Sequence, residues 1–427
     1  MFNMNDKRLL IGLTINFYMV FQVVMSQTSE EKSVDFLSSF MREKLPHFSF
    51  IFANPTKYRL QVIYTQVNRD VKNHPTLISY YYRKLPDEFI SPASMVKLPL
   101  SLLALERLYS LKDLGVTKDT RFLTDCTFIC QDANRKEPLS NDSLPTLSSC
   151  LTKALVVSDN DAYNRLYDFV GQRNINHRLW ELGYQKSQII QRFCICDSTA
   201  NRYSKSFTFY DQKGNVIYQQ ASRFNTEIYT KPIPNMKVGV GYLDERNHFV
   251  KNGMDFSKRN FLPLYQVDDI LKRVIFPELY TESKRFKISS NDLDYIRRLI
   301  ALRPAETGIP ELSKKNDYWE TCTNYLFYGS EENETIPSNV RIFNIVGQSF
   351  GFLSDCAYYT DFANRIEFFL SATIYVNNDN ILNDGIYEYK TIGFPFMKQL
   401  GQTILKYELQ RKVKYNPDLS DLEKLFY

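Results

Sequence analysis

The chain has 427 residues, of which 44% are hydrophobic and 24% are charged, and its formal net charge is +5. This length permits one large domain or two interleaved domains, and the charged fraction excludes wholesale disorder. Acidic and basic residues are mixed throughout, without the basic stripe and interleaved aromatics of a nucleic-acid surface, so we expect no nucleic-acid partner.

The amino terminus is typical of an export signal. Lys7 and Arg8 precede an apolar segment, residues 9–25, and small or polar residues follow at 26–28. We therefore expect residues 1–27 to be a cleaved signal peptide and the mature protein to be periplasmic or secreted. An uncleaved membrane anchor is the alternative, because the apolar segment approaches spanning length. No second spanning segment follows, so no stable membrane span is expected after signal removal.

Seven cysteines and four histidines limit the redox and metal chemistry. In an exported protein, Cys126 or Cys130 could pair with Cys150, and the odd count leaves at least one thiol outside such pairs. Cys194 and Cys196 lack the spacing and the neighbouring histidine of a zinc site. We therefore expect no metal ion and no other cofactor.

Hydrophobic periodicity predicts strands at both ends of the chain and helices between them. The predicted strands are residues 58–67, 76–83, 340–347, 350–359 and 365–376. The predicted helices are residues 30–44, 94–111, 147–157, 161–170, 174–182, 264–274, 290–302 and 387–413, the last kinked near Pro395. The pattern weakens between 192 and 261, where residues 207–218 predict a hairpin. If the terminal strands share one sheet, they bracket a helical insertion.

A serine and a lysine, Ser94 and Lys97, stand three residues apart at the start of a predicted helix. At that spacing their side chains lie on one helix face. A serine hydroxyl is a weak nucleophile until a base removes its proton, and a buried amine can be that base because burial disfavours its charged form. The same pair also occurs by chance on solvated helices.

A second polar cluster, Ser158-Asp159-Asn160, lies between two predicted helices. By itself it is a good helix cap, because each of these side chains can accept from unpaired backbone N–H groups. We expect Asp159 and Asp161 to be helix-start charges that the helix dipole favours.

Ser94-x-x-Lys97, Ser158-Asp159-Asn160 and the strand end Ile345-Val346-Gly347 follow one another in this order. In a layout of strands, helices and strands, that order resembles the penicillin-binding proteins and class A β-lactamases, over roughly residues 58–411 without the region near 200–260. The resemblance implies an α/β fold of the α+β type. Its antiparallel sheet is built from both chain ends, flanked by helices, and carries an inserted all-helical subdomain.

The implied division of the chain follows from this layout. Residues 28–92 would form the first part of the α/β subdomain and residues 336–427 the second. The helical subdomain would span residues 93–335, with an irregular insertion near 200–260.

The resemblance also implies roles for single residues. Ser94 would be the acylated nucleophile, Lys97 its activating partner, and Ser158 the group that passes a proton to the leaving group. Asn160 would hold the substrate's amide.

The strand end would complete the site. Gln348 follows Gly347, and its backbone N–H would form an oxyanion hole together with the N–H of Ser94.

Two departures from the family pattern bear on the substrate. Ile345 and Val346 stand where the family has lysine and a hydroxyl residue. The cation and the hydroxyl that would bind a substrate carboxylate are therefore missing. Arg341 has the same strand parity as Ile345 but lies four positions away. Asp197 and Asn201 match the spacing of the deacylation residues of class A β-lactamases, so Asp197 could aim a water; a surface acid is the other interpretation.

We therefore predict an exported serine hydrolase that acts through a Ser94 acyl-enzyme on an amide, ester or β-lactam bond. Its partner would be a small molecule or peptide, β-lactam-like or peptidoglycan-like. The alternatives are a catalytically weak or inactive penicillin-binding-like binding or sensor protein, and a structural domain with a vestigial dyad. The enzyme is favoured because four matching polar side chains are costly to bury without use.

Overall fold

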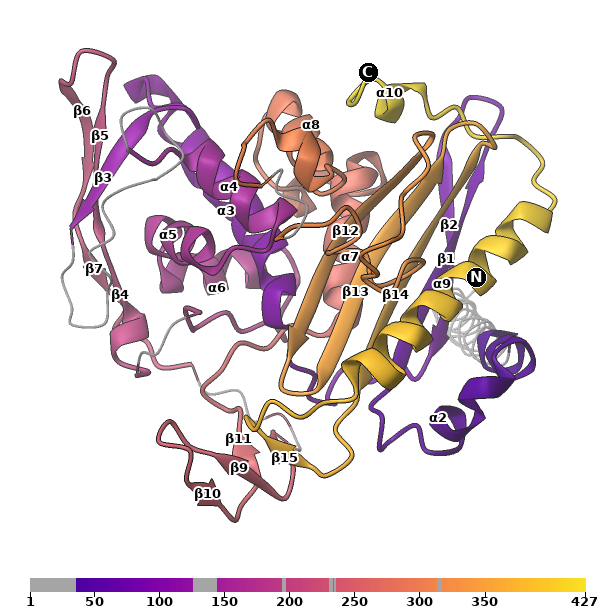
Figure 1. Ribbon diagram of the computed structural model, residues 1–427. Coiled ribbons are helices and arrows are strands. Elements are labelled where there is room, and N and C mark those ends of the chain that lie inside the picture. The colour runs from indigo at the N-terminus through magenta and orange to yellow at the C-terminus, as the bar shows by residue number, and fades with distance from the viewer. Residues whose placement is uncertain (1–35, 126–143, 194–196, 230–232, 234–235, 313–316) are drawn as a thin grey trace, which may run out of the picture.

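The computed structural model describes residues 36–125, 144–193, 197–229, 233, 236–312 and 317–427. A five-stranded antiparallel sheet with the order β12-β13-β14-β1-β2 forms its centre. The strands are β1 (Gln61–Arg69), β2 (Pro75–Tyr82), β12 (Val340–Ser349), β13 (Phe352–Asp361) and β14 (Ile366–Tyr375). Strand β1 pairs with β14, with Thr65 opposite Phe369, so the two ends of the chain share one sheet (Figure 1). This confirms the predicted α/β fold class.

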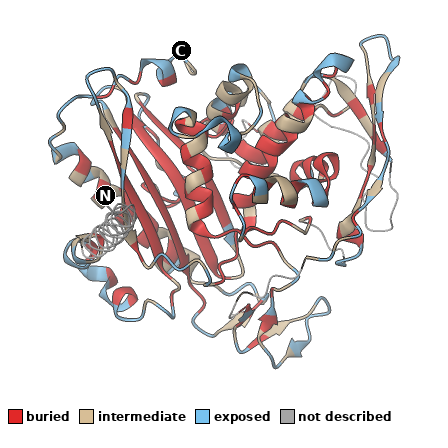
Figure 2. Ribbon diagram, turned by 180° about the vertical axis from the view of Figure 1, so that it is seen from behind, coloured by how far each residue is buried: buried red, intermediate tan, exposed pale blue. Residues whose placement is uncertain are grey.

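The central strands are buried on both faces (Figure 2). Val62 and Tyr64 of β1 share a core with helix α9 (Phe394–Gln410), whereas Ile63 shares a core with helix α7 (Leu264–Ile275). Successive strand residues point to opposite faces, so each strand supplies both cores. Helices α7 and α9 accordingly cover opposite faces of the sheet (Figure 1).

The remaining helices gather mainly beside the edge strand β12 (Figure 1). They are α3 (Lys97–Tyr109), α4 (Leu147–Val156), α5 (Asn160–Val170), α6 (Gln172–Glu181) and α8 (Ser290–Leu299). Two shorter helices, α2 (Ser49–Ala53) and α10 (Ser420–Glu423), lie near the ends of the chain, and residues 36–44 are also helical. Since the Ser94 turn begins at Ala93 and β12 begins at Val340, the predicted limits at 92/93 and 335/336 fall between elements.

The inserted part is not made of helices alone, which corrects the expected all-helical subdomain. The predicted hairpin is present as β5 (Ser206–Tyr210) and β6 (Val216–Gln220), and β3 (Arg121–Asp125) adds to it. Phe122 of β3 stands opposite Phe209, and their ring centroids are 5.6 Å apart. This pairing joins distant segments, so local periodicity did not reveal it.

Short strands replace the irregular insertion that the sequence suggested. They form two-stranded pairs, β4 with β7 and β8 with β11, and a three-stranded sheet of the order β10-β9-β15. Their bounds are β4 (Tyr203–Ser204), β7 (Arg223–Phe224), β8 (Lys237–Val238), β9 (Gly241–Leu243), β10 (Phe249–Val250), β11 (Met254–Asp255) and β15 (Ile381–Leu382).

Two predicted helices begin differently in the structure. The Ser94 segment starts as a 3-10 turn, Ala93–Val96, before α3 begins at Lys97. At the carboxyl end, a π turn, Tyr389–Gly393, precedes α9. Pro395 lies in the first turn of α9, where its missing N–H removes no intrahelical bond, so it starts the helix instead of kinking it.

Several predictions fall on residues outside the described ranges. These are the signal peptide at 1–27 and the cysteines at positions 126, 130, 194 and 196. Cys150 is buried in the core, and its pairing stays a prediction. Within the described ranges, no helix has both the length and the apolarity to cross a membrane.

A buried ion pair fastens α7 to the sheet. Lys272 Nζ lies 2.6 Å from Asp268 Oδ2 and donates to Thr65 Oγ1 on β1 at 2.9 Å, while Ser371 Oγ on β14 donates to Asp268 Oδ1 at 2.8 Å. Both charged side chains are almost fully buried. Removing one partner would leave the other charge buried and unpaired, which costs more than removing both.

We expect Asp268→Asn to lower the free energy of unfolding by about 3 kcal/mol or more, because it leaves Lys272 without a counter-charge. The double variant Asp268→Leu/Lys272→Met should lose clearly less. Urea unfolding of both variants measures the difference. Equal or additive losses in the two proteins would contradict this account of the pair.

Candidate active site

The backbone around Ser94 is a tight turn that aligns the serine with Lys97. Met95 N–H donates to Pro92 O at 2.9 Å, and Ala93 has a φ of +43°, in the left-handed region. In a 3-10 turn, residues three apart are eclipsed, so the turn stacks Ser94 over Lys97 more directly than an α-helix would. Lys97 Nζ lies 2.9 Å from Ser94 Oγ, as the spacing predicted.

The Ser158-Asp159-Asn160 cluster reaches the same amine from the other side. Lys97 Nζ is 2.9 Å from Ser158 Oγ and 2.9 Å from Asn160 Oδ1, and it also contacts the backbone oxygen of Ser158. Ser158 has a φ of +57°, and this left-handed conformation lets both of its oxygens face the amine. Such a backbone costs about 1–2 kcal/mol for an L-residue, which the contacts with Lys97 offset.

Helix capping places this cluster. Asp159 is the N-cap of α5, and its Oδ1 accepts from Ala162 N–H at 2.7 Å, as expected of a helix-start charge. Asn160 is therefore the first residue of the helix and exposes its side chain. Since Asn160 Oδ1 accepts from Lys97, its Nδ2 is left to donate to a ligand.

The environment of Lys97 favours a neutral amine. The residue is fully buried, and this burial lowers the pKa of Lys97 to about 7, although the charge of Asp159 opposes the shift. The Phe193 ring, whose centroid is 5.3 Å from Nζ, covers the amine. A neutral amine has one lone pair to accept the Ser94 proton and two N–H groups to donate to the surrounding oxygens.

Gly347 explains how the edge of the sheet meets the Ser94 turn. A Cβ at this position would lie 2.4 Å from Pro92 O, so only glycine allows β12 to pack against the turn. Asn344 N–H donates off the sheet edge to Ile300 O at 3.0 Å. Gln348 has the same strand parity and therefore directs its N–H off the same edge, toward the turn. That the N–H groups of Gln348 and Ser94 form an oxyanion hole stays a prediction.

The end of β12 supplies no cation. Ile345 and Val346 are each only 4% exposed and pack into the two cores. Arg341 forms a bidentate ion pair with Glu306, at 2.7 and 2.9 Å, so its guanidinium is committed elsewhere.

A cavity of about 180 Å³ opens at Ser94. It is lined by Ser91, Pro92, Ala93, Ser94, Asn160, Gln191, Phe193, Phe256, Arg259, Asn260, Gln348, Ser349 and Phe350. No carboxylate occurs among these described residues. A larger cavity of about 680 Å³ adjoins it and shares Gln191, Arg259 and Phe350.

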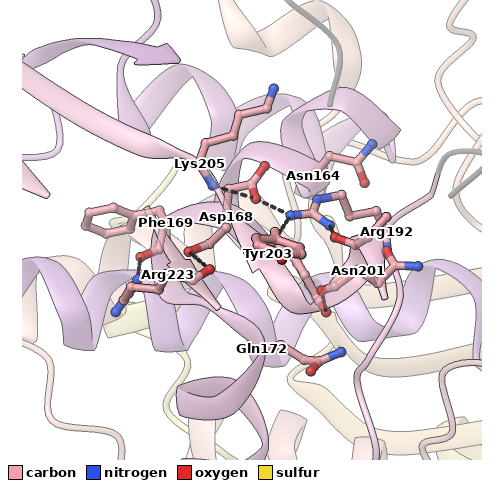
Figure 3. A network of polar contacts seen from close by, with 12 residues as sticks. Asn164, Asp168, Phe169, Gln172, Arg192, Asn201, Tyr203, Lys205 and Arg223 are labelled. Atoms are coloured by element: carbon pink, nitrogen blue, oxygen red, sulfur yellow. Dashed lines mark hydrogen bonds and ion pairs between the residues drawn. The ribbon is translucent and has the colours of Figure 1, made fainter. Parts of the chain in front are cut away.

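A buried polar network holds the segment that carries Phe193 (Figure 3). The guanidinium of Arg192 contacts Asp168 and the backbone oxygens of Tyr203 and Ala200. Next to it, Phe193 N–H donates to Asn164 Oδ1 at 2.8 Å. The network fixes Phe193 against Lys97, a contact for which the sequence gives no local signal.

Asp197 and Asn201 belong to the same network instead of the cavity at Ser94. Asp197 is exposed, and its Oδ1 accepts from Ala200 N–H at 2.7 Å. Asn201 is buried, and its Oδ1 accepts from Arg192 N–H at 2.9 Å while its Nδ2 donates to Asp197 O at 3.0 Å. The structure thus brings Ser94, Lys97, Ser158, Asn160, Gly347 and Gln348 together and leaves these two apart.

Among the described residues, no three His, Cys, Asp or Glu side chains lie close enough together to hold a metal ion. Cys322 and Cys356 are not among the residues that line the cavity at Ser94. Burial raises the pKa of Cys322 to about 11, which makes its thiol a poor nucleophile at neutral pH.

Ser94 and Ser158 thus both face the buried amine of Lys97. A family model described as the β-lactamase enzyme family matches residues 67–232, which contain both polar motifs. Over this stretch the chain is similar to that family. A search of curated proteins gave no match.

Solved structures with a similar arrangement share little sequence with the chain. A β-lactamase from Sphaerobacter thermophilus is 13% identical, with a TM-score of 0.44 over 85% of this chain and 96% of that one. The chromosome-encoded β-lactamase of Vibrio parahaemolyticus is 11% identical, with a TM-score of 0.46 over 88% and 98%. A structure described as PBP-A is 13% identical, with a TM-score of 0.44 over 81% and 91%.

The depressed pKa of Lys97 makes stability depend on pH. The unfolded lysine binds its proton up to pH about 10.5 and the folded one only up to about 7, so stability rises with pH between these values. In Lys97→Met this contribution disappears. Urea unfolding from pH 6 to 10 should show wild type gaining on the variant by up to about 1.4 kcal/mol per pH unit. A pH-independent difference would contradict the shift.

Gly347→Ala should separate activity from stability. The added methyl must push β12 away from Pro92, and with it the Gln348 N–H, the predicted oxyanion donor, away from the Ser94 turn. We expect acylation of Ser94 to slow by about 10²–10³-fold, the loss found for one oxyanion donor. Overpacking should cost only about 1–3 kcal/mol of stability. Thermal unfolding and acylation rates measure the two effects, and an unchanged rate in the folded variant would argue against the role.

Proposed function

We propose that this protein is an exported serine hydrolase that acts through an acyl-enzyme at Ser94. The carrying observation is the fully buried Lys97 amine, which lies 2.9 Å from Ser94 Oγ, Ser158 Oγ and Asn160 Oδ1. A neutral amine in this place removes the Ser94 proton as Oγ attacks an acyl carbon. Ser158 Oγ–H then gives its proton to the leaving group, and Lys97 passes the proton taken from Ser94 to Ser158 in its place.

The surrounding groups would bind the acyl part of the substrate. Asn160 Nδ2 donates to the acyl amide or its equivalent, and the N–H groups of Ser94 and Gln348 stabilise the negative oxygen of the tetrahedral intermediate. The favoured bonds are esters and amides. β-Lactams rank behind them, because β12 offers no cation for their carboxylate, a contact worth roughly 1.5–3 kcal/mol.

Release of the acyl group is the slow half of the proposed reaction. The described lining of the cavity contains no carboxylate that could aim a water at the ester. Asp197, the predicted candidate, caps its own turn instead. A long-lived acyl-enzyme is the expected consequence.

Ile345 and Val346 are buried and apolar, so the end of β12 offers no cation to a substrate carboxylate. This favours a second candidate function, that of a catalytically weak binding or sensor protein. Such a protein would bind its ligand reversibly and equally well after Ser94→Ala. The hydrolase requires the Ser94 hydroxyl for any covalent product, so the same variant discriminates the two functions.

Intact-mass spectrometry after incubation with activated esters and β-lactams tests the hydrolase. Wild type should gain one acyl mass that persists for minutes, whereas Ser94→Ala should gain none. Ser101→Ala is the matched control: it removes a buried hydroxyl of α3, the helix that follows the Ser94 turn. This hydroxyl has no hydrogen-bond partner among the described residues, so the variant should label like wild type.

The outcomes separate clearly when circular dichroism shows that both variants are folded. Labelling that persists in Ser94→Ala would refute the assignment of the nucleophile. An unlabelled wild type that still binds the compounds would favour the sensor.

A further inference from the structure

Arg259 carries a charge that nothing in the described structure neutralises directly. Its guanidinium carbon lies 5.7 Å from the centroid of the Phe256 ring and 5.2 Å from that of Phe350. Among the described residues, the guanidinium makes no hydrogen bond and no ion pair. The two rings hold the cation by cation–π attraction and leave its N–H donors unused.

The position of Arg259 is built into the fold. Arg259 N–H donates to Phe256 O at 3.0 Å, which closes a turn directly after β11. The next residue, Asn260, accepts from the N–H groups of Ile190 and Gln191 through Oδ1, at 2.8 and 2.9 Å. Arg259 is therefore tied to the wall that faces Ser94.

The charge balance of the cavity favours an anionic ligand. Arg259 is the one cationic side chain among the described residues that line the cavity at Ser94, and no acidic side chain lines it. Burial lowers the pKa of Arg259 below its ordinary value, and Glu245, on the wall of the larger cavity, opposes this shift without forming an ion pair with it. Because the cavity has one unpaired guanidinium and no second cation among its described lining residues, it suits a ligand group with a single negative charge. A carboxylate is such a group.

The other lining residues indicate which part of the substrate carries this charge. Asn160 and Gln348, the proposed contacts of the acyl group, share the cavity with Arg259. Ser158, the proposed proton donor to the leaving group, does not line it. Arg259 thus lies with the groups that would hold the acyl part.

We propose that Arg259 binds a carboxylate carried by the acyl part of the substrate, so that the protein prefers acyl donors with a distal carboxylate. This inference rests on the proposed Ser94 acyl-enzyme. The adjoining cavity, which shares Arg259 with the first, gives longer acyl chains room beyond the guanidinium.

Two aryl esters of equal chain length test the preference: mono-4-nitrophenyl glutarate, which ends in a carboxylate, and 4-nitrophenyl valerate, which ends in a methyl group. In both, the bond from Ser94 Oγ to the acyl carbon forms and the bond to the aryl oxygen breaks. The serine proton goes to Lys97, and 4-nitrophenolate leaves. Its absorbance gives kcat/KM for acylation.

Wild type should favour the glutarate ester by at least about tenfold, since a charge-assisted hydrogen bond contributes that much. Arg259→Met should lower kcat/KM for the glutarate ester about tenfold or more and leave the valerate ester within about threefold. Arg259→Lys, which keeps the charge, should retain part of the preference. Arg246→Met removes an exposed cation that lines only the larger cavity and should keep the wild-type ratio.

An equal ratio in wild type and Arg259→Met would overturn the inference while leaving Ser94 acylation intact. If neither ester acylates Ser94, the proposed function fails, and calorimetry with glutarate tests the site alone. Binding to the Ser94→Ala protein that Arg259→Met abolishes would support the carboxylate site. Absent binding, or binding that Arg259→Met leaves unchanged, would overturn it.

Discussion

The burial of one amine is the constraint on which the rest of the site depends. Lys97 is the first residue of α3 and is fully enclosed, so its ammonium form loses the solvation that would stabilise it. Three side-chain oxygens and a backbone oxygen surround Nζ, from two separate polar motifs. The protein thereby holds a weakly basic amine beside Ser94. This arrangement requires left-handed backbone conformations at Ala93 and Ser158.

The second constraint is the close approach of the sheet edge to the Ser94 turn. Strand β12 lies at the edge of the sheet, and Gly347 lets it pack against Pro92 with no intervening side chain. The N–H of Gln348 is then directed off the sheet, toward the Ser94 turn. The sheet itself requires β1 and β14, from opposite ends of the chain, to pair. The proposed oxyanion site therefore depends on this long-range pairing.

The insertion between α6 and α7 changes the electrostatics of the site. The end of β12 is apolar at Ile345 and Val346, whereas the turn after β11 brings in Arg259 between two aromatic rings. The cationic group is thus on the wall formed by the insertion and not on the sheet. In the proposed function, this placement of the charge is what would direct an anionic acyl group to the insertion and not to the sheet.

The sequence by itself determined what depends on neighbours along the chain. The spacing of Ser94 and Lys97 was enough to bring their side chains together, Asp159 capped α5 as its type and position indicated, and the alternating runs at both ends were strands. Only the tertiary structure decided that Lys97 is buried, that β3 joins the hairpin, that Asn201 bonds the backbone of Arg192, and that Arg259 faces Ser94. The reason is physical: helix and strand periodicity are set within a few residues, whereas desolvation and the pairing of charges depend on groups that folding brings from far along the chain.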